Sequence, residues 1–92
     1  GEADREAIII RNTTEKVRNL AGWQLEAGAQ YKYVFPDFLL WPQGIVTLYI
    51  SPGEDNPGEL HWGLEQPILH LVRELTLYNR KGEVVSTYRL NP

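Results

Sequence analysis

Residues 19–37 read NLAGWQLEAGAQYKYVFPD, and this stretch decides which class of fold the chain adopts. Two short runs alternate apolar with polar residues: WQLE at 23–26 and YKYVF at 31–35. A period of two is typical of β-strands, because successive side chains point to opposite faces of a sheet. Pro36 ends the second run, since proline has no backbone N–H to donate to a neighbouring strand. The stretch therefore predicts two strands joined by a turn at AGAQ.

The glycine at position 22 explains why a large aromatic residue follows a Leu-Ala-Gly corner. Gly22 permits a sharp turn, after which Trp23 enters a strand and faces inward. The aromatic residues of 31–35 then either join the same core or form an exposed stripe. The predicted structural core consists of five residues: Trp23, Leu25, Phe35, Leu75 and Leu77.

Five further segments have strand character along the rest of the chain. Each is rich in β-branched or aromatic residues or alternates with a period of two, and most are bounded by turn residues. They are AIIIRN (7–12), IVTLYI (45–50), LHWG (60–63), ELTLY (74–78) and EVVSTYRL (83–90), with NRKG (79–82) as a hairpin loop between the last two. About seven short strands without a long amphipathic helix predict an all-β sandwich. With 92 residues, the chain is expected to form a single domain over 1–92, with residues 1–6 as a frayed lead-in.

The connections between these strands differ in character. Residues 12–22 are predicted to form a polar loop with Val17 and Leu20 pointing inward, and residues 37–44 an apolar connector. Residues 51–59, SPGEDNPGE, contain two Pro-Gly pairs and are expected to be mobile. Residues 64–73, LEQPILHLVR, fit either a loop or a short helical turn.

Composition excludes several classes of site. The net charge of −3 argues against a nucleic-acid surface, which needs a basic face. The chain has no cysteine, so disulfides and thiolate zinc sites are excluded. No apolar run approaches the roughly 20 residues of a membrane span, so direct membrane insertion is not expected. The start GEADREA suggests a domain excised from a longer protein.

The order of the turn motifs resembles the lamin tail domain family. The motifs are Leu20-Ala21-Gly22-Trp23, Phe35-Pro36 and residues 77–82, LYNRKG, and the resemblance covers Ala7 to Leu90. It implies an immunoglobulin-like β-sandwich that acts as a non-enzymatic interaction or scaffolding module. The resemblance fits a prokaryotic member of the family. A bacterial member would be expected outside the cytoplasm or in the cell envelope.

The polar residues give no pattern of a catalytic or metal site. His61 and His70 lie in no metalloprotease or nucleophile-elbow motif, so we interpret both as structural and expect neither an enzyme nor a cofactor. Glu54, Asp55 and Glu59 supply oxygen ligands of the kind that calcium prefers. Their spacing does not match an EF-hand, and a solvated acidic loop is the favoured interpretation.

The resemblance to lamin tail domains, together with the lack of a catalytic or metal pattern, favours recognition of a protein partner of unknown identity. The connectors place more apolar residues in loops than is usual, which predicts an interaction surface of Phe38, Leu39, Trp41, Ile68 and Leu69. The alternative is a carbohydrate-binding module in which exposed Trp41 and Trp62 stack on a sugar ring. The basic residues Arg73, Arg80, Lys81 and Arg89 are interpreted as a charged edge that prevents aggregation rather than a nucleic-acid site. Asn12-Thr13-Thr14 also matches an N-glycosylation acceptor.

Overall fold

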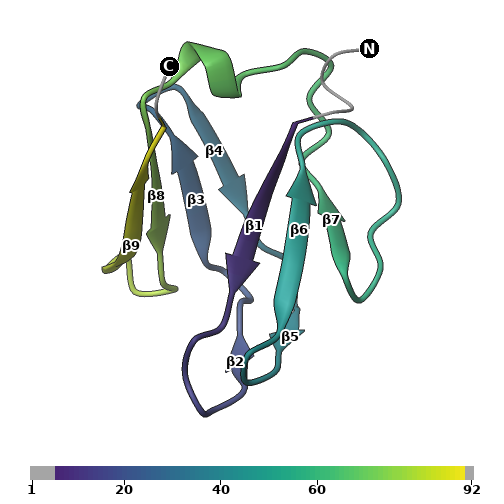
Figure 1. Ribbon diagram of the computed structural model, residues 1–92, viewed down its shortest axis with the longest axis vertical. Helices are drawn as coiled ribbons and strands as arrows, with labels where there is room; N and C mark the ends of the chain where they lie inside the picture. The colour runs from purple at the N-terminus through teal and green to yellow at the C-terminus, as the bar shows by residue number, and fades with distance from the viewer. Residues whose placement is uncertain (1–5, 91–92) are drawn as a thin grey trace. The chain divides into compact units, whose positions relative to one another are not determined.

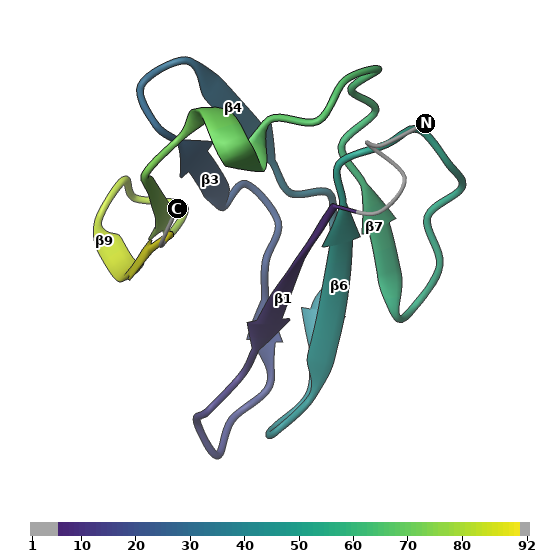
Figure 2. The ribbon, with the colours of Figure 1, turned by 45° about the horizontal axis from the view of Figure 1, so that its top comes forward.

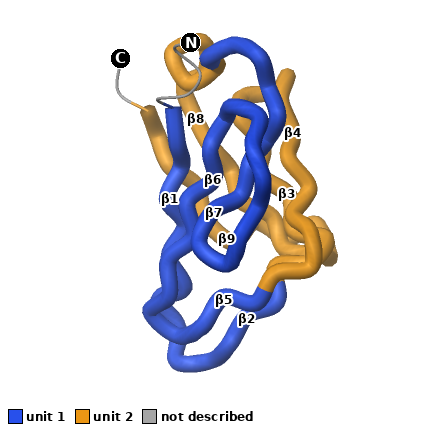
Figure 3. The backbone as a smooth tube through the Cα atoms, turned by 90° about the vertical axis from the view of Figure 1, so that its right-hand side faces the viewer, with its two compact units in different colours: residues 1–19, 39–67 blue, residues 20–38, 68–92 orange. Residues whose placement is uncertain are grey.

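A computed structural model describes residues 6–90, and residues 1–5 and 91–92 lie outside the described part of the chain. The predicted lead-in therefore falls outside it apart from Glu6, whose carbonyl accepts a hydrogen bond from Ile50 N. The backbone divides into two compact units, shown in Figure 3. Unit 1 comprises Gly1–Asn19 and Leu39–Pro67, and unit 2 comprises Leu20–Phe38 and Ile68–Pro92. Each unit is described by itself.

The described residues are almost entirely β (Figure 1). Nine strands occur between residues 6 and 90: β1 (Ala7–Arg11), β2 (Arg18–Asn19), β3 (Gln24–Ala27), β4 (Tyr31–Val34), β5 (Leu39–Leu40), β6 (Ile45–Tyr49), β7 (Glu59–His61), β8 (Glu74–Tyr78) and β9 (Val84–Arg89). The remaining element is a single turn of 3₁₀-helix, η2 (Leu69–Leu71). The all-β class predicted from the alternating segments is confirmed.

The larger sheet of unit 1 has the strand order β1-β6-β7. β1 runs antiparallel to β6, with Ile8 opposite Leu48, and β6 runs parallel to β7, with Leu48 beside Leu60. These three side chains share one face of the sheet and are buried, as are Val46 and Ile50. The opposite face presents Ile9, Thr47 and Glu59 in the next row of the register. This one-sided burial explains the alternating pattern of the β6 sequence.

The second sheet of unit 1 is a two-residue ladder between β2 and β5. Arg18 pairs with Leu40 and Asn19 pairs with Leu39. Leu40 is buried, whereas the preceding residue, Leu39, is exposed. Neither strand was predicted, because the sequence around each shows no alternation long enough to identify.

Unit 2 is built on one antiparallel sheet with the strand order β4-β3-β8-β9. Leu25 of β3 lies between Tyr33 of β4 and Leu77 of β8, so one face of the sheet collects apolar side chains. Phe35, which follows β4, packs edge to face on Tyr33 with ring centroids 5.0 Å apart. Both of these aromatic residues are buried, which answers the question that the sequence left open: they join the core. Tyr31 is half-buried.

Two of the turn motifs meet in unit 2. Gly22 has a φ of 78°, in the left-handed region that favours glycine, as expected for the sharp corner. A Cβ at this position would lie 3.2 Å from Arg80 Cγ, so the stem of Arg80 covers the corner. Arg80 belongs to the hairpin loop at 79–82, where Asn79 Oδ1 accepts hydrogen bonds from the backbone N–H of Lys81 and of Glu83. The LAGW corner and the NRKG hairpin therefore support each other.

All seven predicted strands are present, with ends shifted by no more than two residues. Residues 64–73 form a loop that contains the turn η2, so both interpretations of this segment are partly correct. The inward orientation expected of Val17 is wrong, because this side chain is exposed. Leu20 is buried as predicted.

Replacing Phe35 by alanine should destabilise the domain by about 3–5 kcal/mol, because the ring is 2% exposed and leaves a cavity beside Tyr33. The matched control is Val34→Ala on the preceding residue, whose side chain is 55% exposed and should change stability by less than about 0.5 kcal/mol. Chemical unfolding of both variants measures the difference. Equal effects would contradict the placement of Phe35 in the core.

Candidate functional site

A buried asparagine organises one end of unit 1. Asn12 follows β1 and donates from Nδ2 to the carbonyl oxygens of Lys16, at 2.7 Å, and of Leu40, at 2.9 Å. Its Oδ1 accepts hydrogen bonds from the backbone N–H of Thr14, at 3.0 Å, and from the hydroxyl of the same residue, at 2.6 Å. One side chain therefore joins the loop after β1 to strand β5. Every polar atom of the buried amide has a partner, as burial requires.

The backbone of Asn12 fixes the turn that follows β5. Asn12 N donates to Gly44 O at 2.9 Å, and Gln43 N donates to Asn12 O at 2.8 Å. Within the turn, Gly44 N donates to Trp41 O at 2.8 Å, and Gln43 adopts a positive φ of 61°. Proline at the second position and a positive φ at the third are features of a type II turn. A Cβ on Gly44 would lie 2.9 Å from Trp41 O, so only glycine fits there.

This turn holds Trp41 in an exposed position. The tryptophan is 63% exposed and Leu39, two residues earlier on the same side of the extended chain, is 53% exposed. Asn19 pairs with Leu39 across the β2–β5 ladder, which ends at the pair of Arg18 with Leu40. Val17 is the next residue before β2, and Trp41 is the next residue after β5. Val17 is also exposed. We name Val17, Leu39 and Trp41 the Trp41 patch; all three belong to unit 1.

The five residues predicted as an interaction surface differ in exposure. Leu39 and Trp41 are exposed and lie in unit 1. Phe38 and Leu69 in unit 2 are half-buried. Ile68, also in unit 2, is only 3% exposed, so its side chain is not offered to a partner. Ile68 immediately precedes η2, and a short turn gave no periodicity from which its burial could have been read.

The five residues predicted as core are all at least partly covered. Leu25, Phe35 and Leu75 are buried. Trp23 and Leu77 are half-buried. Leu77 lies next to a register shift in the β8–β9 pairing, where Ser86 rather than a large side chain stands opposite it.

The two tryptophans proposed for sugar stacking do not share the same environment. Trp41 is exposed, whereas Trp62, just after β7, is half-buried and its backbone N–H donates to Tyr49 O. In the β6–β7 ladder, the rings of Tyr49 and His61 stack at a centroid distance of 5.3 Å. A Cβ on Gly53 would overlap the His61 ring, so Gly53 covers that ring. His61 is therefore packed between its neighbours.

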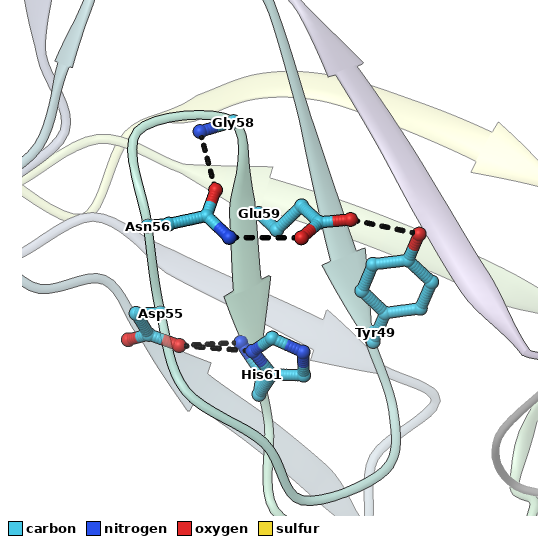
Figure 4. Close-up of polar contacts among 6 residues, drawn as sticks. All are labelled: Tyr49, Asp55, Asn56, Gly58, Glu59 and His61. Carbon is cyan, nitrogen blue, oxygen red and sulfur yellow. Dashed lines mark hydrogen bonds and ion pairs between the residues drawn. The ribbon is translucent and has the colours of Figure 1, made fainter.

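The acidic loop that joins β6 to β7, which the sequence predicts to be mobile, contains several hydrogen bonds (Figure 4). Asn56 N and Glu59 O, and Glu59 N and Asn56 O, form a small backbone bridge. Asn56 Oδ1 accepts from Gly58 N, and Asp55 Oδ1 accepts from His61 N at 2.8 Å. Parallel strands usually need a connection of a dozen or more residues, and this fold-back lets residues 50–58 connect β6 to β7.

Glu59 lies at the centre of this polar cluster. Asn56 Nδ2 donates to one carboxylate oxygen at 2.8 Å and Tyr49 Oη donates to the other at 3.2 Å (Figure 4). These two donors, Asn56 first, hold the pKa of Glu59 below its ordinary value. The hydrogen bond and the negative charge of Glu59 raise the pKa of Tyr49 in return. The cluster orders the loop, and its donors are already used within the chain.

Metal and membrane sites are not indicated by the described part of the chain. Between residues 6 and 90, no three side chains of histidine, aspartate or glutamate gather closely enough to hold a metal ion. His70 lies in η2 and is exposed. No helix over the same residues has the length and hydrophobicity needed to cross a membrane.

Asn12 of the predicted glycosylation motif has a structural role in the folded chain. Its side chain is buried, and both N–H groups of the amide are donated to backbone carbonyls. An attached sugar would remove one of these N–H donors and disturb this pair of hydrogen bonds. The match to the acceptor motif therefore reflects the structural use of Asn12 and Thr14.

Replacing Asn12 by alanine should lower the free energy of unfolding by about 2–4 kcal/mol, because two backbone carbonyls and the Thr14 groups lose their buried partner. Asn12→Asp should be destabilising as well at neutral pH, since a carboxylate has no N–H to donate. Thr13→Ala is the control at an exposed neighbouring position. Urea unfolding measures all three, and a loss below about 1 kcal/mol in Asn12→Ala would contradict the role assigned to Asn12.

The carboxyl of Glu59 should titrate with a midpoint below 4.5, its ordinary value. A lowered pKa in the folded state means that the stabilisation is complete above the ordinary value and is lost as the pH falls through the lowered one. Tyr49→Phe and Asn56→Ala should both raise the midpoint, the second more strongly because Asn56 is the larger cause. Carbon-detected NMR of the carboxyl group follows the titration. A wild-type midpoint at or above 4.5 would exclude this arrangement.

A comparison with protein families finds a match whose range contains the motifs that meet in unit 2. The family model described as Lamin Tail Domain matches residues 1–91, nearly the whole chain. Among curated proteins, none matches this chain. The matched range includes the LAGW corner, the Phe-Pro pair after β4 and the hairpin loop between β8 and β9. The chain belongs to the lamin tail domain family, and its fold class is the immunoglobulin-like β-sandwich.

Proposed function

We propose that the domain is a non-enzymatic module that binds a protein partner through the Trp41 patch. The observation that supports this proposal is the exposed tryptophan on a turn that is fixed by the backbone of Asn12. Tryptophan is among the residues that contribute most to binding when a partner covers them. A turn that is already ordered loses little conformational entropy when the partner binds.

The neighbours of Trp41 favour a protein over a sugar. Leu39, two residues before Trp41, and Val17, which immediately precedes β2, are exposed aliphatic side chains. Burying aliphatic groups against an apolar partner contributes roughly 25 cal/mol of binding free energy per Å² of buried surface. The same groups offer no hydrogen bond to a sugar hydroxyl. The sugar-binding alternative needs a second exposed ring beside Trp41, and Trp62 is half-buried.

The family match also supports a binding role, since lamin tail domains are an immunoglobulin-like family of interaction modules rather than typical enzymes. His61 is enclosed by Tyr49 and Gly53, and its ring Nδ1 lies 3.3 Å from Asp55 Oδ1. A general base needs access to the proton that it abstracts. The packing of His61 therefore favours the structural interpretation of this residue.

The test is a comparison of wild-type protein with Trp41→Ser in quantitative affinity capture from cells that express the parent protein. Partners that depend on the Trp41 patch should be lost with Trp41→Ser and with Leu39→Ser. They should be retained with Ile9→Ser, because Ile9 is exposed on β1 and lies outside the patch. All three variants should unfold within about 0.5 kcal/mol of the wild type, since none of these side chains is buried.

A second experiment decides between the proposal and its alternative. Soluble oligosaccharides are titrated into ¹⁵N-labelled protein while the indole signal of Trp41 is followed. Saturable shifts of this signal would overturn the proposal in favour of carbohydrate binding. Identical protein capture by wild type and Trp41→Ser would also overturn it.

A further inference from the structure

The outer strand of the unit 2 sheet is unusually open. β9 pairs with β8 on one side only and forms one edge of the strand order β4-β3-β8-β9 (Figure 1). Figure 2 shows β9 on the side of β3 away from β4. All six of its residues are exposed. It is also the longest strand in the described part of the chain, at six residues. An edge of this kind presents unpaired backbone groups to solvent.

β9 lacks most of the features by which proteins protect such edges. Residues 84–88, VVSTY, contain no charge and no proline, and four of the five are β-branched or aromatic. The opposite edge of the same sheet, β4, is shorter and carries exposed Lys32. The one irregularity of β9 is a register shift near its start, opposite Leu77 and Tyr78. Beyond that shift, residues 86–89 form a regular edge.

The pairing with β8 determines which backbone groups of β9 point outward. Leu90 N donates to Arg73 O, so the backbone of Leu90 faces β8. In an antiparallel ladder successive residues alternate in direction, so Tyr88 also faces β8, and the N–H and C=O groups of Thr87 and Arg89 point away from it. No described residue pairs with these outward groups. They have the spacing that a further strand requires.

Tyr88 adds a side-chain contact for such a strand. It stands opposite Leu75 in the register, and Leu75 is 6% exposed whereas Tyr88 is 66% exposed. The tyrosine therefore lies at the end of an apolar row and has no cross-strand neighbour on its outer side. An apolar residue on an added strand would pair with this ring, an interaction worth about 0.2–1 kcal/mol.

The charges around β9 indicate the chemistry of the partner. Residues 73–90 hold four basic side chains and two acidic ones, although the whole chain carries a net charge of −3. Arg89 at the end of β9 and Lys81 in the hairpin loop are exposed, and neither forms an ion pair with a described residue. Glu74 stands opposite Arg89, yet the two make no ion pair. A second copy of the chain would bring a second basic edge, whereas an acidic segment would be attracted.

We propose that β9 binds an extended, acidic segment of a partner protein, which adds to the sheet as a fifth strand. The backbone of Thr87 and Arg89 supplies the hydrogen bonds, Tyr88 supplies the apolar contact, and Lys81 and Arg89 select for acidic side chains. This mode of strand addition gives affinity through the main chain and specificity through alternate side chains. The site lies in unit 2, and it goes beyond the binding proposed for the Trp41 patch.

The probe is a ten-residue peptide that alternates glutamate with valine, titrated into ¹⁵N-labelled domain at low salt. Saturable shifts are expected at the amides of Thr87 and Arg89 and in the neighbouring strand β8. A peptide methylated on alternate backbone nitrogens cannot form the ladder and should not bind. Replacing glutamate by lysine in the peptide should weaken binding by about tenfold or more, as should raising the salt concentration.

Variants of the domain give the matching controls. Lys81→Glu and Arg89→Glu together should weaken binding of the acidic peptide by about tenfold. Lys32→Glu, which reverses one basic charge on the opposite edge strand β4, should leave it unchanged. The free energy of unfolding of both variants should lie within about 0.5 kcal/mol of the wild-type value, because all three side chains are exposed.

Three results would overturn the proposal. No shift at Thr87 and Arg89 with peptide at millimolar concentration would show that the edge does not accept a strand. Equal binding of the glutamate and lysine peptides would remove the acidic specificity. Concentration-dependent shifts at the same amides without peptide would show that the occupant is a second copy of the chain.

Discussion

The exposed surface of unit 1 depends on the hydrogen bonds of one buried asparagine. Asn12 uses its side-chain amide to join the loop after β1 to β5, and it uses its backbone to hold the turn at 41–44. Leaving a tryptophan largely exposed forgoes the roughly 1.5–3 kcal/mol that burial of a large apolar side chain contributes. Polar contacts to Asn12, rather than burial of Trp41, therefore position the turn.

Most of the fold was predictable because its strands have one covered face. IVTLYI and ELTLY alternate as a strand with one buried face must, and both strands lie where they were expected. The two-residue strands β2 and β5 were missed because they are too short to show a period. Their pairing follows from contacts distant in sequence, such as Asn12 Nδ2 with Leu40 O. No local pattern contains that information.

The candidate surface was predictable only in part, for the same physical reason. Apolar residues in connectors suggested exposure at Leu39, Trp41 and Ile68 alike. The structure exposes the first two and buries Ile68. Val17 shows the opposite error, since it was expected to point inward and its side chain is exposed. Hydrophobicity indicates which residues gain from burial, and tertiary pairing decides which of them obtain it.

The two surfaces would recognise partners by different physical means. The Trp41 patch offers side chains on a fixed turn, so shape and apolar area decide what it binds. β9 offers backbone hydrogen bonds, so any extended segment fits, and the basic side chains Lys81 and Arg89 supply the selectivity. An immunoglobulin-like domain can host both because open sheet edges and connecting loops are separate features of that fold.

Amide hydrogen exchange at Asn12, Gln43 and Gly44 tests the central claim most directly, because these N–H groups form the hydrogen bonds that fix the turn. We expect all three amides to exchange as slowly as those of the adjoining strand β6, because each donates a backbone hydrogen bond. Exchange at the rate of an open loop, while β6 remains protected, would contradict it. Trp41 would then lie on a mobile turn, and the proposed surface would lose its structural basis.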